Sequence, residues 1–478
     1  MLNEAEMKYF SQTLSLFESP LSKLPKDNRW VKLGDSLPWG KIERIYNSRL
    51  NNRGAGAGNI AARTVIGALI VKHKLCLSDV ETIEAIRENP YIQYMLGLEE
   101  FTTERVFDPS LFVTIRKRLG VDDINSFTEA LMSAGGEDGK GDRPTHSGTL
   151  KVDATCCDAE MRYPTDLDLL HDGLRVVERA LDKFCGKMCL ERPHTGWEKA
   201  HKMYSATIKR RSKSPKGLSR CLQYLIHTLS KNVRVALLTM GKVRVDHNLC
   251  LTKRDAREFA AVLAMLKQQK EMFEKRTHKC KDRIVSVFQP HVRPIVRGKA
   301  KARVEFGAKI GASIVSGYTF IDHHSWDAYN ECDDLMPHLR AYKRRFGCLP
   351  RVFEGDKIYM NRRNRRILKL LGVEVGGMPL GRPPKDVVAV RAKMAQYVGE
   401  RNEIEATFGT AKRIYNANDI RGKLPATGAT WAALCFFAKN VWRFLRNLLF
   451  ALLGIRLFAL LGDTFHTEPA RGKLACVC

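Results

Sequence analysis

The sequence predicts an α/β protein in which an all-helical N-terminal unit precedes a mixed-sheet domain with a large, basic, mainly helical insertion. Three observations support this fold class. Apolar residues recur at helical spacing in the first 120 residues, short alternating strands occur near residue 150 and after residue 300, and positive charge is concentrated between those strands. Strands that alternate with helices indicate an α/β sheet rather than an all-β or all-α domain.

Length and composition narrow the class of protein. The chain has 478 residues, which suggests two to four domains. A hydrophobic content of 44% and a charged content of 28% are typical of a globular protein and exclude a largely disordered one. The formal net charge of +28 favours a polyanionic partner, which composition alone leaves open between DNA, RNA and a membrane surface.

Secretion and membrane insertion are not expected. The thirteen cysteines include no CxxC pair, so reduced thiols are the simpler interpretation. The N-terminus lacks a basic segment followed by an apolar one, as a secretory signal requires. The most apolar stretch, 434–461, is interrupted by charges, and its longest uncharged run of nine residues is too short to cross a bilayer. We therefore predict a cytoplasmic protein without a membrane partner, in which this stretch is a buried or interface helix.

The N-terminal unit is predicted over residues 1–133. Apolar spacing indicates a helix over 60–74, Ser78 and Glu81 form a capping-box pattern, and Asp108-Pro109 offers an N-cap followed by a proline at the first helical position. Short helices joined by short turns indicate a helical bundle or a helix-turn-helix-like module, which we expect to recognise DNA. Glycines and charges over 134–143 predict a flexible linker, placed at 134–147.

The sheet domain is predicted over residues 148–430, followed by a C-terminal apolar helix and tail over 431–478. Residues 150–153 form a short alternating strand, and residues 304–314 keep a period of two before the turn at Ser316-Gly317 and a second strand at 318–321. A third strand is expected at 351–353, with a basic helix over about 361–371.

The insertion, over about 165–300, carries most of the positive charge. Residues 201–303 hold 26 Lys and Arg but only 6 Asp and Glu. A solvated helical surface usually mixes both signs, whereas residues 209–216 contain no acid at all. We therefore expect the insertion to contact nucleic acid through its cluster of basic residues, Lys209, Arg210, Arg211, Lys213 and Lys216.

A helix at 401–412 carries the most informative residues. At 100° per residue, its four side chains of interest lie within about 60° of one another on one face, and these are Arg401, Glu405, Phe408 and Lys412. Alone, this stripe is better explained by an exposed helix with an ion pair between Arg401 and Glu405, because such pairs are abundant. Glu403 falls on the opposite face, where we expect it to be exposed to solvent.

Two aspartates change the interpretation of that helix. Asp153 and Asp356 each follow a predicted strand, and the loops at strand ends are where ligand groups converge in an open α/β sheet. Three carboxylates brought together would repel, and a hard divalent ion such as Mg²⁺ or Mn²⁺ would relieve the repulsion. Asp322 is a rival ligand at the end of the hairpin, although a carboxylate at a turn is ordinary.

Taken together, these motifs resemble those of the DDE insertion-sequence transposases of the insertion-sequence-five superfamily. The resemblance covers most of the chain. It rests on two kinds of feature. The first is a set of short motifs at residues 77–81, 108–110, 152–155, 324–327 and 356–359. The second is the spacing of an Arg, a Glu and a Lys, which are Arg401, Glu405 and Lys412 here. One position departs from the family pattern: Val398 occupies the place of a family tyrosine, and Tyr397 stands one residue earlier.

The resemblance implies an RNase H-like catalytic domain with Asp153, Asp356 and Glu405 as its catalytic triad and Arg401 and Lys412 as signature partners. Asp153 would bridge two Mg²⁺ or Mn²⁺ ions, with Asp356 and Glu405 each holding one. The implied activity is metal-dependent cleavage at the ends of an insertion sequence and strand transfer into target DNA.

The implied partners are double-stranded DNA, as element ends and as target, and further copies of the chain in a homodimer or higher assembly at the bacterial nucleoid. Trp326 is predicted either to stack on an unpaired base or to be buried. Two alternatives remain open: a non-catalytic DNA-binding protein derived from a transposase, and a metal-dependent RNase H-like nuclease without strand transfer.

Overall fold

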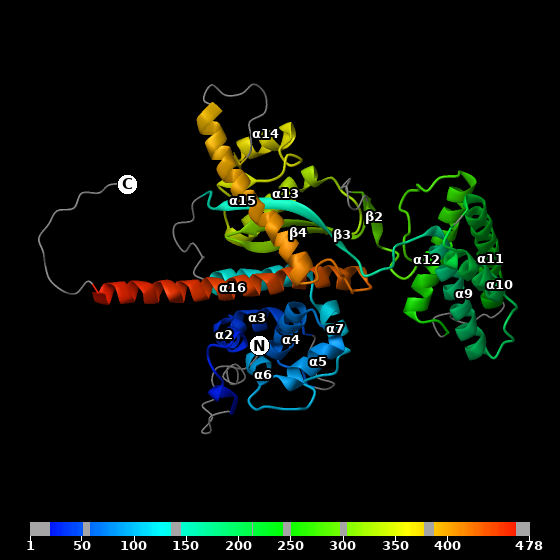
Figure 1. The fold of residues 1–478 in the computed structure, drawn as a ribbon, viewed down its shortest axis with the longest axis horizontal. Coiled ribbons are helices and arrows are strands. Elements are labelled where there is room, and N and C mark those ends of the chain that lie inside the picture. The colour runs from blue at the N-terminus through cyan, green and yellow to red at the C-terminus, as the bar shows by residue number, and fades with distance from the viewer. Residues whose placement is uncertain are drawn as a thin grey trace, which may run out of the picture.

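A mixed sheet of six strands lies at the centre of the chain, with helices on both of its faces (Figure 1). The computed structural model describes residues 20–50, 58–134, 145–212, 214–241, 250–296, 304–376 and 387–464. The strands are β1 (Thr149–Asp158), β2 (Arg293–Val296), β3 (Val304–Val315), β4 (Tyr318–Ser325), β5 (Val352–Glu354) and β6 (Glu374–Gly376).

The strand pairing leaves part of β1 without a neighbour on one side. β3 pairs antiparallel with β1 over nearly its whole length, from Lys151 opposite Ile314 to Asp158 opposite Gly307. On the other edge, β5 runs parallel to β1 but pairs with it only over Thr149–Lys151. β6 continues the sheet parallel to β5, while β2 and β4 pair with different parts of β3. Beyond Lys151, the β5-side edge of β1 is therefore free of strand pairing.

Different helices cover the two faces of the sheet. On one face, Phe320 and Asp322 of β4 contact α13 (Leu335–Phe346) through Arg345 and His338. On the other face lie α15 (Val387–Ile414) and α16 (Pro425–Thr464), and α14 (Arg362–Leu370) packs near β6. The strands are buried where they approach the hairpin turn, over residues 310–315 of β3 and 318–321 of β4.

The N-terminal helices pack against α16 and the sheet and share a hydrophobic core with them (Figure 1). The Asn125 side chain bonds to the backbone of Ile321 through both its amide nitrogen and its oxygen, and Asn440 of α16 bonds to Thr319 in the same way. These two amides satisfy backbone groups of β4 that have no strand partner. The helices are α2 (Arg29–Ser36), α3 (Trp39–Asn47), α4 (Ala62–Leu75), α5 (Asp79–Glu88), α6 (Pro90–Met95), α7 (Leu111–Arg118) and α8 (Val121–Ala134), after a 3₁₀ turn at Pro20–Lys23.

Two of the predicted helix starts in this unit have different outcomes. The Ser78 and Glu81 capping box is confirmed, because each side chain bonds to the other residue's backbone N–H. The prediction of an N-cap at Asp108 is wrong: α7 begins at Leu111, and the Asp108 carboxylate instead accepts the N–H of Ser110 in a turn. An aspartate before a proline can close such a turn as readily as a helix.

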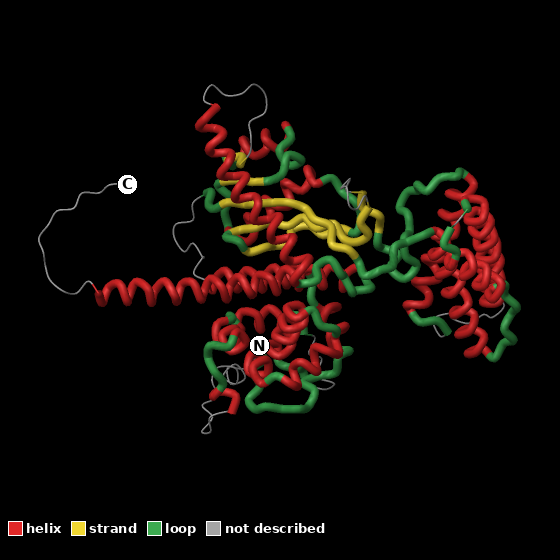
Figure 2. The backbone as a smooth tube through the Cα atoms, in the orientation of Figure 1, coloured by secondary structure: helices red, strands yellow, loops and turns green. Residues whose placement is uncertain are grey.

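The insertion forms four helices with a hydrophobic cluster of their own. They are joined to the sheet by loops only (Figure 2). Thr165 caps the first helix by accepting the N–H of Asp168, and Thr252 caps the last with a capping box to Asp255. The helices are α9 (Asp166–Met188), α10 (Trp197–Lys209), α11 (Pro215–Gly241) and α12 (Lys253–Glu274).

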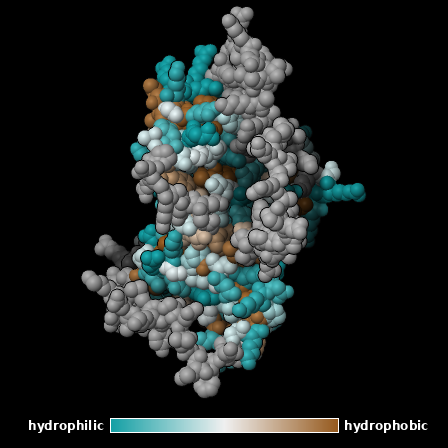
Figure 3. Space-filling view, turned by 90° about the vertical axis from the view of Figure 1, so that its left-hand side faces the viewer, coloured by the Kyte–Doolittle hydropathy of each residue, from teal (hydrophilic) through white to brown (hydrophobic). Residues whose placement is uncertain are grey.

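Most of the predicted linker, and the tail with Cys476 and Cys478, lie outside the described residues. All cysteines that the structure describes are free, which agrees with the prediction of reduced thiols. In the same part of the chain, no helix combines the length and the apolar character that a membrane crossing requires. Where the surface in Figure 3 is coloured, hydrophilic side chains predominate and apolar ones form small separate groups.

Candidate functional site

A cavity of about 690 Å³ lies along the free edge of β1, and we call it the carboxylate cavity. It is lined by residues from six separate segments, which are β1, β2, β3, the 3₁₀ turn Glu331–Asp334, the turn after β5 and α15. The structure therefore brings together four of the predicted site residues, which are Asp153, Asp356, Glu405 and Lys412.

The strands position the two aspartates. Asp153 lies two residues beyond the last β1 residue that pairs with β5, and its Oδ1 accepts the N–H of Ala154 at 2.8 Å. Asp356 follows the end of β5 by two residues, and its Oδ1 accepts the N–H of Lys357 at 2.7 Å. Gly355 permits this turn, because a Cβ there would lie 3.1 Å from both Val152 Cγ2 and Tyr359 Cβ. Each aspartate is thus oriented by its neighbouring backbone.

Helix α15 supplies the third carboxylate. Ile404 and Phe408 are buried and anchor the helix, with the Phe408 ring edge-on to Phe436 of α16 at 6.2 Å between centroids. Glu405, Phe408 and Lys412 all line the cavity, so the stripe inferred from the helical period lies on the side facing β1. The side chain of Arg401 lies outside the described residues.

Burial, with a smaller contribution from neighbouring carboxylates, perturbs the pKa of Asp153. Burial raises the pKa of Asp153 to about 6; the Ala154 N–H opposes this increase, and the carboxylates of Glu331, Asp356 and Glu405 add to it. A carboxylate that shares a site with three others is harder to ionise, since each negative charge disfavours the next. This arrangement is electrostatically unfavourable without a cation and is typical of functional sites.

Two residues of the cavity were not foreseen from the sequence. Glu331, in the 3₁₀ turn Glu331–Asp334 before α13, forms an ion pair of 2.9 Å with Lys309 of β3. Lys309 also donates to the carbonyl oxygen of Tyr329 at 2.8 Å and lies over the Tyr329 ring. The sequence did contain one signal for Lys309, which is a lysine within an otherwise mostly apolar strand. Glu331 lies outside the helices and strands expected from the sequence and gave no such signal.

Comparisons with known proteins decide the family. Residues 18–118 match the model of a transposase domain (DUF772), and residues 354–441 match that of a transposase DDE domain. The second match includes Asp356 and Glu405. The chain belongs to the DDE transposases of insertion sequences. A curated relative of this transposase is the uncharacterized protein ORF8 in the nfe locus of Rhizobium meliloti, which is 30% identical over 153 residues, or 32% of this chain and 72% of the relative. No solved structure matches the chain.

The DDE domain of this transposase implies an RNase H-like fold, and the mixed α/β architecture with its curled mixed sheet agrees with that class. In the described strands, β3 and β4 form an antiparallel hairpin beside β1, and β5 and β6 continue the sheet in parallel on the other side. The open edge of β1 and the turn after β5 thereby place Asp153 and Asp356 at the same cavity.

Asp322, the rival ligand, lies elsewhere in the transposase. Its side chain is fully buried and accepts ion pairs from Arg345 at 2.6 Å and His338 at 2.7 Å. Burial alone would raise the pKa of Asp322, but Arg345 and His338 outweigh it, so the pKa lies below its ordinary value. Because Asp322 is already neutralised by protein groups, its role is structural.

The prediction that Glu403 is simply exposed to solvent is wrong. Its side chain is about one-third exposed and forms ion pairs with Lys151 of β1 at 2.9 Å and with Arg443 of α16 at 3.1 Å. Burial would raise the pKa of Glu403, but these cations lower it overall. Glu403 does lie away from the carboxylate cavity, and it connects α15 to the strand that carries Asp153.

Two aromatic residues have packing partners. The hydroxyl of Tyr397 donates to Glu374 of β6 at 3.0 Å. The indole N–H of Trp326 donates to the carbonyl oxygen of Pro425 at 3.3 Å, and the half-buried ring meets the His291 ring edge-on at 4.4 Å. The stacking of Trp326 on a base stays a prediction.

The predicted basic cluster lies in the turn between α10 and α11. Lys209, Arg210, Arg211 and Lys216 are exposed there, whereas Lys213 lies outside the described residues. Their contact with DNA also stays a prediction.

The donor set of the carboxylate cavity fits a hard divalent ion. Aspartate and glutamate oxygens are the ligands that Mg²⁺ and Mn²⁺ prefer, and a bound cation would favour the ionised form of Asp153, which burial and the neighbouring carboxylates disfavour. Among the described residues, no three potential ligands are close enough together to form a preassembled metal site. A bound ion would therefore draw these side chains inward.

Proposed function

We propose that the carboxylate cavity is the catalytic site of a DNA transposase that cuts the ends of its insertion sequence and joins them to target DNA. The observation that carries the proposal is the gathering of Asp153, Asp356, Glu405 and Lys412 around one cavity, although 259 residues separate the first from the last. The transposase family supports the reaction class, which is phosphoryl transfer on nucleic acid.

Asp153, Asp356 and Glu405 would hold two Mg²⁺ or Mn²⁺ ions. Such a pair supplies activation of the attacking oxygen and stabilisation of the leaving oxygen in an in-line displacement. The buried anchors Ile404 and Phe408 fix the position of Glu405, and the N–H groups of Ala154 and Lys357 orient the aspartates before substrate arrives.

The basic residues of the cavity would bind the DNA backbone. Lys412 lines the cavity on the same helix as Glu405 and can meet a phosphate oxygen as a point charge. We propose that Arg401, which belongs with Glu405 and Lys412 to the Arg, Glu and Lys signature of the family, is also part of the catalytic site. Lys309 is held by Glu331, and we infer that this ion pair keeps a cation at the cavity wall without leaving its charge unbalanced.

The remaining parts of the chain would hold and assemble the DNA. We propose that residues 1–133 recognise the element ends and that residues 148–430 form the catalytic domain, with residues 431–478 as a C-terminal helix and tail. Lys209, Arg210, Arg211, Lys213 and Lys216 of the insertion, and Trp326, would contact DNA. Two ends must be brought together for transposition, so we expect a homodimer or a higher assembly.

A strand-transfer assay tests the proposal. The substrate is end-labelled duplex made from the DNA that flanks the gene on each side, incubated with target plasmid and Mg²⁺. Wild-type protein is expected to give cut and joined products. Asp153→Asn is expected to give neither while binding the same duplex, because a neutral amide is a poor ligand for a hard cation.

The control is Asp327→Asn, which changes a carboxylate that is about three-quarters exposed and does not line the cavity. It should cut and join at the wild-type rate. Cut but unjoined products would indicate a nuclease without strand transfer, and binding alone would indicate a non-catalytic DNA-binding protein. Retained cleavage by Asp153→Asn would reject the assignment of this site.

A further inference from the structure

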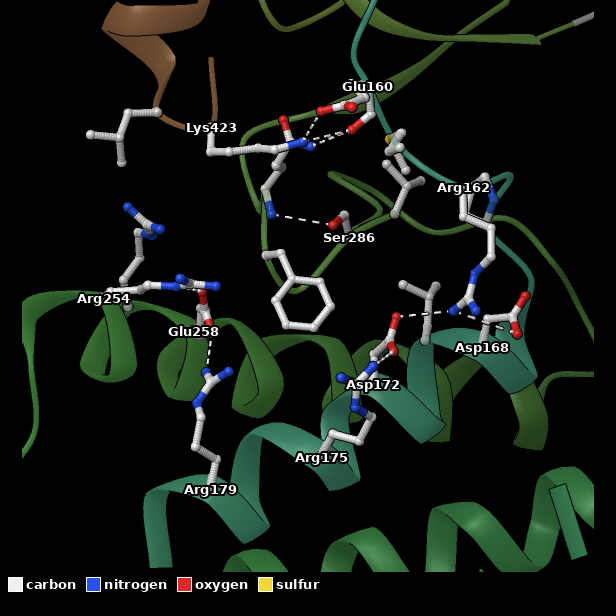
Figure 4. A pocket seen from close by; sticks show the side chains of 18 of the residues that line it. Glu160, Arg162, Asp168, Asp172, Arg175, Arg179, Arg254, Glu258, Ser286 and Lys423 are labelled. Atoms are coloured by element: carbon white, nitrogen blue, oxygen red, sulfur yellow. Dashed lines mark hydrogen bonds and ion pairs between the residues drawn. The ribbon is translucent and has the colours of Figure 1, made fainter. Parts of the chain in front are cut away.

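A second and larger cavity, of about 820 Å³, lies where the four-helix insertion meets the sheet, and we call it the junction cavity (Figure 4). Its walls come from α9 and α12 of the insertion, from the segments 160–164 and 285–289 that connect it to the sheet, from α7, and from the residues just before α16. Three parts of the chain therefore meet at this cavity.

The lining is basic and carries more cations than its own acids can pair. Seven of the lining residues are Lys or Arg and four are Asp or Glu, which leaves a net charge of +3. The acids hold cations at the wall: Glu160 pairs with Lys423 at 2.8 Å, and Asp172 pairs with Arg162 at 3.1 Å (Figure 4). Glu258 likewise lies between two arginines.

Two cations of the lining have no such partner. Among the described residues, neither Lys117 of α7 nor Arg257 of α12 forms an ion pair or a hydrogen bond. The Nε of Arg257 is buried and unsatisfied, and so is the Oε1 of Gln289 in the same lining. A buried guanidinium N–H without an acceptor is costly, so an anionic oxygen at this place would be favourable.

The junction cavity follows the carboxylate cavity along β1. Seven residues separate Asp153 from Glu160, so the two places are at most roughly 23 Å apart at the rise of an extended chain. The chain after α15 runs alongside, since the N–H of Ile420 donates to the carbonyl oxygen of Asp158 at 2.9 Å. Lys412 lines the first cavity and Lys423 the second.

This upper limit is within the reach of one bound duplex. A distance of at most roughly 23 Å corresponds to no more than about seven base pairs at 3.4 Å per nucleotide. A duplex with one phosphate in the carboxylate cavity would thus present further phosphates at the junction cavity, and backbone contacts of this kind position a duplex without reading its sequence.

We propose that the junction cavity binds the sugar-phosphate backbone of the DNA that the carboxylate cavity cleaves, with Lys117 and Arg257 contacting phosphates that flank the scissile bond. This inference rests on the proposed function and adds a second anchoring point to it. The insertion would then hold the DNA on one side of the cleavage site in two places. One is the junction cavity, and the other is the cluster of basic residues between α10 and α11.

The test measures how DNA affinity depends on salt. The probe is a fluorescein-labelled, mixed-sequence duplex of about 30 base pairs, bound without Mg²⁺ to the full chain at salt concentrations between about 50 and 300 mM. Each phosphate contact contributes about 0.9 to the slope of log affinity against log salt. The double variant Lys117→Gln with Arg257→Gln is expected to lower that slope by about two and to weaken binding roughly tenfold.

The matched control is Lys267→Gln with Lys270→Gln, two exposed lysines of the same helix α12 that do not line the cavity. It removes the same charge and is expected to keep the wild-type slope. An unchanged slope in the cavity variant, or an equal decrease in both variants, would overturn the inference, because charge at the cavity would then have no special role.

A second pair of variants guards against a folding defect. Val113 lines the cavity from α7 and is 42% exposed, so Val113→Glu adds a negative charge at the wall without disturbing the core. Val80→Glu is its control, at a 55% exposed valine of α5 outside the lining. Only Val113→Glu should weaken binding, and equal affinities for the two would contradict the inference.

The result is separable from the proposed function. Binding is measured without metal, whereas cleavage is measured in the strand-transfer assay. If wild-type protein cleaves DNA but the cavity variants keep the wild-type dependence of affinity on salt, only the proposed DNA-binding role of the junction cavity is rejected. The absence of cleavage with a decreased slope would overturn the catalytic assignment and leave the cavity as a backbone-binding site.

Discussion

Replacing Asp153 by asparagine is expected to stabilise the metal-free protein at neutral pH even though it removes a proposed catalytic residue. Burial and the neighbouring carboxylates raise the pKa of Asp153 from 3.8 in the unfolded chain to about 6 in the folded one. The folded state therefore binds the proton more tightly, and stability falls as pH rises from about 4 to about 6. The difference between the two pKa values corresponds to about 3 kcal/mol that is lost above pH 6.

An asparagine has no charge to lose, so Asp153→Asn should avoid this penalty. Its Oδ1 can still accept the Ala154 N–H, and its amide can donate to nearby carboxylates. In EDTA at about pH 7.5 we expect the melting temperature of Asp153→Asn to exceed that of the wild type by on the order of 5 °C. Near pH 4 the two should melt together.

The assay is thermal unfolding followed by fluorescence at a series of pH values, with Asp327→Asn as the exposed-carboxylate control. Adding Mg²⁺ at pH 7.5 should raise the melting temperature of the wild type more than that of Asp153→Asn, because the variant lacks one of the three carboxylates proposed to hold the ions. A lower melting temperature for Asp153→Asn than for the wild type at pH 7.5 would refute the electrostatic account of the carboxylate cavity.

Three further predictions concern other carboxylates. Asp322→Asn should destabilise the fold by about 3 kcal/mol, because it removes one of the two carboxylates, Asp322 and Glu129, that pair with the buried guanidinium of Arg345; an unchanged melting temperature would contradict this. Glu405→Gln should abolish cleavage and change the melting temperature little. Glu403→Gln, on the same helix, should lower the melting temperature and retain cleavage. The reverse pattern would contradict the proposed roles of both residues. Glu331→Gln should lower the affinity for Mn²⁺, measured by calorimetry, if its carboxylate reaches the ions, and equal affinities would limit it to a structural ion pair.

The fold was predictable where one period dominates a segment. The hairpin expected at 304–314 and 318–321 is present as β3 and β4, and the basic helix expected over 361–371 is α14 at 362–370. The third strand, expected at 351–353, is β5 at 352–354. The start of α7 was missed because Asp108-Pro109 satisfies turn and helix signals equally well.

The site was predictable as far as strand ends and helical faces define it. Asp153, Asp356 and Glu405 follow from such local rules, and the structure places them at one cavity. The partners of Glu331 and Asp322 do not follow, since Lys309 and Arg345 lie 22 and 23 residues away along the chain. Those pairings depend on the register of β3 and β4 and on the packing of α13, which no local pattern encodes.

The position of the insertion within the sheet has a consequence for biosynthesis. Strand β1 is synthesised about 145 residues before β3, its principal partner. At 5–20 residues per second, β1 therefore remains unpaired with β3 for roughly 10–30 s. The four intervening helices make mostly local contacts and can fold during that interval. Once they have folded, the Gln289 side chain donates to the carbonyl oxygen of Glu160 at 3.0 Å, so the two ends of the insertion are adjacent. Because the folded insertion already brings its two ends together, the pairing of β1 with β3 costs only the chain entropy of closing a short loop. We therefore expect β1 and β3 to pair rapidly once β3 has been synthesised.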